Sequence, residues 1–166
     1  MELTSTAFAN IESIPSRYSG EGADVSPPLL WSDLPTGTTW LALLCEDPDA
    51  PRHPGRNGPF VHWVIYNFLP SAGMLPEGIP QGAWMGEPLA CEQGRNSFGR
   101  LGYNGPLPPS GHGMHRYFFR LLALSDRLRL SPGAGRDELL RGSEGKVLGR
   151  AALLGTYERG REERAG

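Results

Sequence analysis

The chain has 166 residues, 39% of them hydrophobic, which suits one globular unit with one core. Glycine (23 residues) and proline (16) are abundant and helix-period segments are few, so a fold of strands and loops is favoured over a helical bundle. The net charge of −2 excludes a global field that would attract nucleic acid or an anionic membrane.

The ends and the cysteines predict a cytoplasmic protein. The N-terminus has neither the basic nor the apolar region of a signal peptide, and no segment reaches the length of a transmembrane helix. Cys45 and Cys91 follow no disulfide framework spacing, so two free thiols in a reducing compartment are expected.

The first 68 residues predict extended structure. Residues 8–18 are irregular, residues 26–31 are extended because proline disfavours the α region in its predecessor, and residues 33–37 form a turn. The apolar runs 38–45 and 60–68 predict two buried strands. In the second strand a period of two predicts two faces, with His62, Val64, Tyr66 and Phe68 on one and Val61, Trp63, Ile65 and Asn67 on the other.

The rest of the chain is less regular. Residues 69–111 predict a long irregular stretch that is ordered by its aromatic residues, and residues 115–124 predict a third strand. Segments 138–141 and 146–152 predict two short helices divided by Gly142. A last strand at 153–158 and a frayed charged tail at 159–166 follow.

Polar residues gather at the ends of the predicted strands. Asp47 and Asp49 bracket Pro48, whose ring stiffens the loop; capping of turn amides is the alternative role of these acids. His62 and His115 each lie at the start of a strand and converge if those strands are neighbours. Tyr117 shares a face with His115, and the glycines nearby permit close backbone approach to a ligand at positions 105, 111 and 113.

An ordered set of motifs resembles the phosphatidylethanolamine-binding protein family, in its bacterial Raf kinase inhibitor-like branch. The set runs from about residue 20 to the C-terminus and comprises Asp24-Val25-Ser26-Pro27-Pro28-Leu29 with Trp31, Asp47-Pro48-Asp49-Ala50-Pro51, His62-Trp63-Val64, Asn96-Ser97-Phe98-Gly99, Gly102-Tyr103-Asn104-Gly105-Pro106, Pro108-Pro109, Gly111-His112-Gly113, His115-Arg116-Tyr117-Phe118-Phe119 and Leu154-Gly155-Thr156-Tyr157.

The resemblance implies a single domain over residues 1–166, mainly β, with an antiparallel β-sandwich-like core and a few short helices near the C-terminus. It also implies a non-enzymatic binding or regulatory protein without a cofactor, which holds phosphate-like anions or phospholipid head groups and in some relatives inhibits a kinase or protease. The implied pocket residues are Asp47, Asp49, His62, His115 and Tyr117, walled by Pro48, Pro51, Gly105 and Pro106.

Further expectations follow from the same resemblance. The Ala50–Pro51 bond is a candidate cis peptide. Asp47 is expected to orient a histidine and favour its imidazolium form, while the role of Asp49 stays open. Anion affinity should then weaken as pH rises through the histidine titration. The resemblance also suggests a homodimer, with Trp63, Trp84 or Phe98 as patch residues.

The chain departs from its relatives in places. Leu107 and Gly20 stand where many relatives carry cysteine, which removes redox chemistry there, and the C-terminal helix of eukaryotic relatives is absent or reduced. Loop 52–59 is basic and either recruits an anionic partner or is simply solvated, the second being favoured.

Two rival hypotheses remain at this point. One is a hydrolase, metal-assisted in one version, that uses Asp47 or Asp49 with His62 or His115; it is disfavoured because Ser110 is the nearest nucleophile candidate and lies in a turn. The other is an inhibitor whose pocket rim docks a partner protein.

Overall fold

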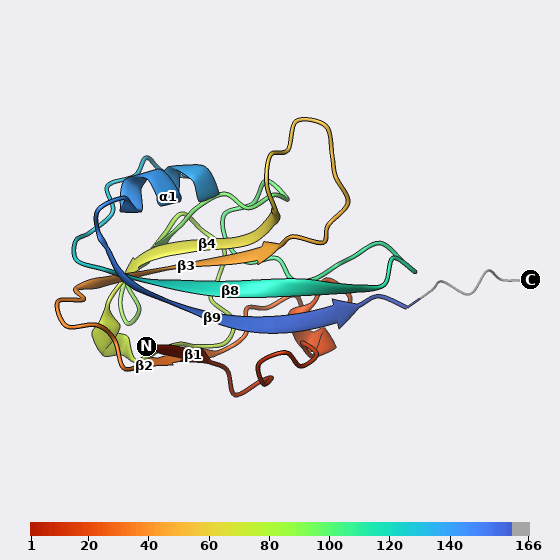
Figure 1. Ribbon diagram of the computed structural model, residues 1–166, viewed down its shortest axis with the longest axis horizontal. Coiled ribbons are helices and arrows are strands. Elements are labelled where there is room, and N and C mark those ends of the chain that lie inside the picture. The colour runs from red at the N-terminus through yellow and green to blue at the C-terminus, as the bar shows by residue number, and fades with distance from the viewer. Residues whose placement is uncertain (161–166) are drawn as a thin grey trace, which may run out of the picture.

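The computed structural model describes residues 1–160 as two antiparallel sheets and one helix (Figure 1). The large sheet has the order β6-β7-β4-β3-β8-β9 and the small sheet the order β1-β2-β5. The strands are β1 (Glu2–Thr4), β2 (Leu29–Ser32), β3 (Trp40–Asp47), β4 (Phe60–Phe68), β5 (Met74–Leu75), β6 (Trp84–Met85), β7 (Cys91–Gln93), β8 (Met114–Leu124) and β9 (Val147–Glu158). The helix is α1 (Arg136–Ser143), and 3₁₀ turns lie at Ser16–Tyr18 and Pro70–Ala72.

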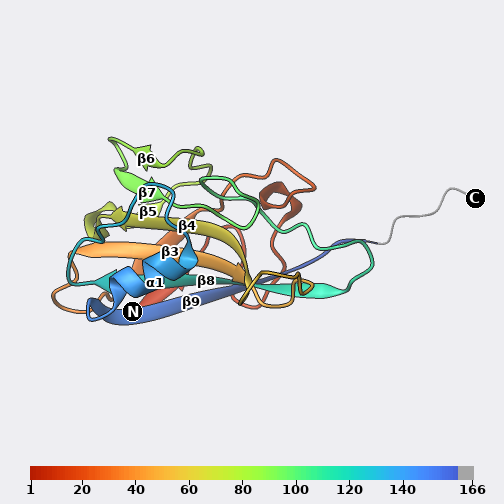
Figure 2. The ribbon, with the colours of Figure 1, turned by 90° about the horizontal axis from the view of Figure 1, so that it is seen from above.

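The small sheet and α1 cover opposite faces of the large sheet (Figures 1 and 2). The period of two in β3 divides its apolar side chains between these layers. Leu41 and Leu43 pack with Leu29 of the small sheet, whereas Leu44 packs with Leu139 of α1. Burial on both faces explains why β3 and β4 are apolar almost throughout. The expected mainly antiparallel β-sandwich-like fold is confirmed.

Strand β4 does not keep the alternation that a regular strand would have. Cys45 and Glu46 are opposite Trp63 and Val61, so His62 is the extra residue of a β-bulge. Asn67 is the extra residue of a second bulge and has a φ of 55°. Each bulge reverses the faces beyond it. Val61 therefore lies on the same face as Val64 and Tyr66, and Phe68 lies on the same face as Trp63 and Ile65. Both placements are the opposite of those predicted.

One helix forms where two were predicted. Asp137 and Glu138 lie in the first turn of α1, where negative charge favours a helix N-terminus, and the Gly135 N–H donates to Glu138 Oε2 at 3.0 Å. Gly142 lies inside the helix instead of dividing two, and an added Cβ there would be 2.8 Å from Leu130.

The second predicted helix is wrong, because residues 146–152 belong largely to β9, which begins at Val147. A glycine turn at Gly145 (φ 76°) precedes this strand. β9 then pairs with β8 from Val147 opposite Leu124 to Glu158 opposite Met114. These ladder hydrogen bonds with a distant partner outweigh the helix propensity of the leucine, arginine and alanine residues in the segment.

The long stretch 69–111 is ordered and contains the short strands β5, β6 and β7. Tyr103 is buried, whereas Trp84 and Phe98 are exposed. Trp63 is fully buried, so its expected place in a surface patch is wrong. The cis peptide bond of the described chain is Glu87–Pro88, and the expectation for Ala50–Pro51 is also wrong.

The cysteines agree with the prediction from the sequence, whereas most of the predicted tail lies outside the described residues. Both cysteines are free and buried, and burial raises the pKa of the Cys91 thiol to about 11. Within residues 1–160, no helix has the length and apolar character needed to cross a bilayer. The predicted tail lies mostly in residues 161–166, outside the described residues.

Candidate functional site

A small pocket opens where β3, β4 and β8 bring polar residues to the same end of the large sheet. Its volume is about 210 Å³. The predicted site residues that line it are Asp47, Pro51, His62, His115 and Tyr117. The histidines do converge, because β3 pairs with both β4 and β8. His62 on β4 and His115 on β8 are therefore on either side of Asp47, the last residue of β3.

Asp47 and two histidines form a chain of hydrogen bonds. His115 Nδ1 lies 2.8 Å from Asp47 Oδ2, and both side chains are almost fully buried. The other ring nitrogen of His115, Nε2, lies 2.6 Å from His112 Nδ1. Asp47 Oδ1 accepts from the Asp49 backbone N–H at 2.7 Å. Both carboxylate oxygens are therefore engaged inside the protein, and the contact with Asp47 fixes the orientation of the His115 ring, while the imidazolium form stays a prediction.

His62 is held by the backbone of the opposite loop. Its Nδ1 lies 2.7 Å from the Asn104 carbonyl oxygen, which can only accept, so Nδ1 carries a proton and donates. Asp24 supports that loop by accepting from the Asn104 side chain and from the Gly105 N–H, at 2.9 and 2.6 Å. Burial lowers the pKa of His62 below its usual 6.5. The ring is therefore neutral at pH 7, with Nε2 unprotonated.

The depressed pKa of His62 makes stability depend on pH. As pH falls below about 6.5 the unfolded chain takes up a proton at His62 while the folded chain does not, so acid should lower the free energy of unfolding. The stability that neutral His62 gives the folded protein is fully present above pH 6.5. Below that pH the free energy of unfolding falls by at most about 1.4 kcal/mol per pH unit from this residue. Urea unfolding at several pH values between 5 and 8 measures it. His62→Asn, which keeps a donor for Asn104, should show a shallower slope, and an unchanged slope would contradict the assignment.

Tyr117 brings a buried hydroxyl to the pocket. The residue is 1% exposed, its ring stands edge-on to His62 at 5.1 Å between centroids, and its hydroxyl has no hydrogen-bond partner within residues 1–160. Burial raises the pKa of Tyr117 far above its usual 10, and Asp47 raises it further by its charge and by a side-chain interaction that falls short of hydrogen-bond geometry, so the hydroxyl keeps its proton. A buried donor without a partner costs stability unless something else satisfies it.

Four predicted site residues lie elsewhere. Asp49 pairs with the Arg116 side chain at 2.9 Å, and that guanidinium holds the pKa of Asp49 below its usual range. Pro48 lines a different cavity. Gly105 and Pro106 contact the N-terminal segment: a Cβ on Gly105 would be 1.9 Å from the Tyr18 carbonyl oxygen, and the Pro106 carbonyl accepts from Gly20.

Several residues at the site were not among those predicted from the sequence. Arg56 donates to the Pro51 carbonyl and places its guanidinium 5.3 Å from the Phe60 ring centroid, while its Nε is buried without a partner in the described chain. His112 belongs to the motif Gly111-His112-Gly113 and has no role predicted from the sequence; it contacts His115 from outside the lining of the pocket. The other lining residues are Ala50, Phe60, Phe98, Leu107, Pro108 and Pro109.

Two packed antiparallel sheets, with an Asp–His–Tyr pocket where strands of the larger sheet end, define a class of β-sandwich protein with a small polar pocket. The chain belongs to the phosphatidylethanolamine-binding protein family, whose model matches residues 4–158. The family expected from the motifs is thereby confirmed.

Bacterial and archaeal proteins are similar to this chain along nearly all of its length. A UPF0098 protein of Methanothermobacter thermautotrophicus is 46% identical over 160 residues, covering 96% of this chain and 100% of the relative. A solved structure of a Chlamydia trachomatis homologue of phosphatidylethanolamine-binding protein has a TM-score of 0.84 at 37% identity, covering 95% of this chain and 97% of that one. Escherichia coli YbcL, described as a member of the mammalian family, has a TM-score of 0.82 at 28% identity with the same coverage.

Proposed function

We propose that this protein binds a small phosphate-like anion or a phospholipid head group in the pocket around Tyr117, and that it acts by binding rather than by catalysis. The observation that carries the proposal is the Tyr117 hydroxyl, a buried donor without a protein partner in the described chain, at the wall of a 210 Å³ pocket. An anionic oxygen would satisfy that donor by a charge-assisted hydrogen bond.

The charges around the pocket suit an anion. Asp47 directs both oxygens to protein donors, so its charge is not offered to a ligand as an acceptor. Arg56 brings a cation to the rim and carries no carboxylate partner among the described residues. His62 is neutral, and its unprotonated Nε2 can accept a hydrogen bond from a phosphate hydroxyl or from the ammonium of phosphoethanolamine.

Binding is favoured over hydrolysis by the composition of the lining. The described residues around the pocket include no serine, threonine or cysteine. Ser110 does not line it, and its hydroxyl donates to the Gly160 carbonyl at 2.7 Å. Inhibition of a kinase or protease stays a prediction of the family resemblance, as does a homodimer.

Tyr117→Phe tests the proposal with a single atom removed. We expect phosphoethanolamine affinity to fall by about tenfold to a hundredfold, the range for a lost hydrogen bond to a charged group. Unliganded stability should change little, because the removed hydroxyl makes no well-formed hydrogen bond within residues 1–160. Isothermal titration calorimetry and thermal unfolding measure the two effects.

Tyr66→Phe is the matched control, since Tyr66 is equally buried but packs in the α1 layer. It should leave affinity unchanged. Tyr117→Phe with wild-type affinity for phosphate and phosphoethanolamine would refute the proposed site. Repeating the titration with wild-type protein across pH 5 to 8 tests the expected weakening at high pH, and a flat affinity would contradict a histidine contribution.

A further inference from the structure

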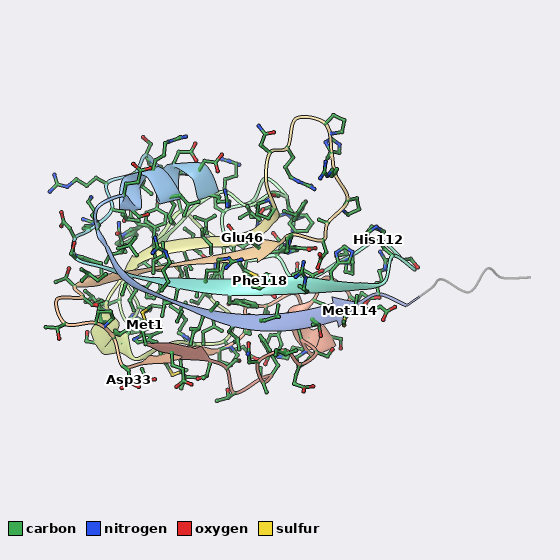
Figure 3. The ribbon with its side chains drawn as sticks, in the orientation of Figure 1. Met1, Asp33, Glu46, His112, Met114 and Phe118 are labelled. Atoms are coloured by element: carbon green, nitrogen blue, oxygen red, sulfur yellow. The ribbon has the colours of Figure 1, made fainter. Side chains whose placement is uncertain are left out.

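A larger cavity adjoins the pocket on the face of the large sheet that carries α1. It has a volume of about 670 Å³ and lies between loop 48–59, strands β3 and β8, and the first residue of α1. Figure 3 shows Glu46 on this face, between α1 and the arching loop. Four arginines line the cavity, which we call the arginine trough: Arg52, Arg56, Arg120 and Arg136.

Glu46 organises two of these arginines. Its side chain is only 6% exposed and accepts from Arg136 Nε at 2.5 Å and from Arg120 Nε at 3.2 Å. Glu46 engages each guanidinium through Nε, and Arg136 Nη1 donates to Asp137. Within residues 1–160, both Nη groups of Arg120 and Nη2 of Arg136 make no hydrogen bond. The Arg120 guanidinium also lies 4.6 Å from the Phe118 ring centroid, which restrains it further.

The other two arginines have no carboxylate partner. Within residues 1–160, Arg52 makes no hydrogen bond or ion pair, and Arg56 bonds only to a backbone carbonyl and leaves its Nε buried and unsatisfied. Two carboxylates line the trough, and one of them, Asp47, is committed to His115. Asp137, outside the lining, pairs with Arg136 as well. Four guanidiniums against these three carboxylates still leave an excess of positive charge in a protein whose net charge is −2.

We propose that the arginine trough is a second binding site, for a compact polyanion with at least two closely spaced phosphate or carboxylate groups. A guanidinium fork binds either group in bidentate geometry. The Nη pair of Arg120 forms such a fork and Nη2 of Arg136 adds a further donor, and both guanidiniums are already oriented by Glu46, so they lose little freedom on binding. The cavity falls within the usual size range of small-molecule sites, whereas the Tyr117 pocket is below it. A buried carboxylate needs only one guanidinium for neutrality, so Glu46 alone does not explain four.

Calorimetric titration with inorganic tripolyphosphate at low ionic strength tests this site, with citrate as a second probe. We expect saturable binding of one polyanion per chain. The double variant Arg52→Gln/Arg120→Gln should weaken it by about tenfold or more, because two charge-assisted contacts are lost. Arg52→Gln alone should already weaken it without a change in melting temperature, since Arg52 is exposed and unpaired in the described chain.

Two controls separate this site from its alternatives. Arg129→Gln makes the same charge change at an exposed residue outside the trough and should have no more than about a twofold effect. Tyr117→Phe should leave tripolyphosphate binding unchanged, which distinguishes the trough from the Tyr117 pocket. Binding by tripolyphosphate alone would identify a phosphoryl chain as the ligand group, and competition by citrate would extend the class to carboxylates. Absence of saturable binding, an equal loss in Arg129→Gln, or a loss confined to Tyr117→Phe would overturn the proposal.

Discussion

Asp47→Ala should lower the free energy of unfolding by about 3–5 kcal/mol, because two hydrogen bonds to a buried carboxylate are lost at about 1.5–3 kcal/mol each. The aspartate and His115 side chains are 4% and 2% exposed, so His115 Nδ1 would lose its acceptor without gaining water. The Asp49 backbone N–H would lose its acceptor as well. Urea denaturation at pH 7 measures the loss. Asp47→Asn keeps an oxygen acceptor and should lose clearly less.

Asp49→Ala is the matched control, with the same chemical change two residues along the chain. Its partner Arg116 is half exposed, so we expect a loss of about 0–1 kcal/mol, as for other surface ion pairs. Equal losses in Asp47→Ala and Asp49→Ala would show that the Asp47–His115 pair does not have the stabilising role given to it here.

Gly105→Ala should destabilise the protein by about 3 kcal/mol, the upper end of the range for overpacking. A Cβ at this position would lie 1.9 Å from the Tyr18 carbonyl oxygen and 2.8 Å from Ser19 Cα. Both obstacles are backbone atoms, so no side-chain rotation relieves them. The loop would have to move, and the adjacent Asn104 carbonyl that accepts from His62 would move with it.

Thermal and urea unfolding measure this effect, and ligand titration should show weaker binding in the folded fraction of Gly105→Ala. Gly160→Ala is the control, because a Cβ there meets nothing within 4 Å and should change stability by less than about 0.5 kcal/mol. A Gly105→Ala protein with wild-type stability would mean that the loop is looser than its contacts indicate.

Strands β3, β4 and β8 could be predicted because their apolar runs are long and bounded by turn residues. The second half of β9 agrees with the strand predicted at 153–158. Its first half could not be predicted, because it has good helix formers and only the partner strand β8 makes an extended conformation favourable. The alternation within β4 failed at His62 and Asn67, since a bulge depends on register with a neighbouring strand and leaves no mark in a single segment.

For the candidate site, the sequence located most of the residues but did not decide which of them share a pocket. The motifs located Asp47, His62, His115 and Tyr117, because each lies at or near the end of a recognisable strand. They assigned the histidine-orienting role to Asp47 and left the role of Asp49 open, although both acids were expected in the pocket. The structure separates them by their partners, a buried histidine for one and an exposed arginine for the other. Gly105 was expected at the pocket wall, whereas its lack of a side chain serves close packing against Tyr18.

By itself, the sequence determined the family, the β-rich fold and the chemical types present at one end of the large sheet, because these depend on local composition and on the order of motifs. Only the tertiary structure decided which of those residues share a pocket, that the Tyr117 hydroxyl is left without a partner in the described chain, and that four arginines from a loop, a strand and a helix line one trough. The physical reason is that burial, hydrogen-bond partners and local charge arise from contacts between residues far apart in the chain.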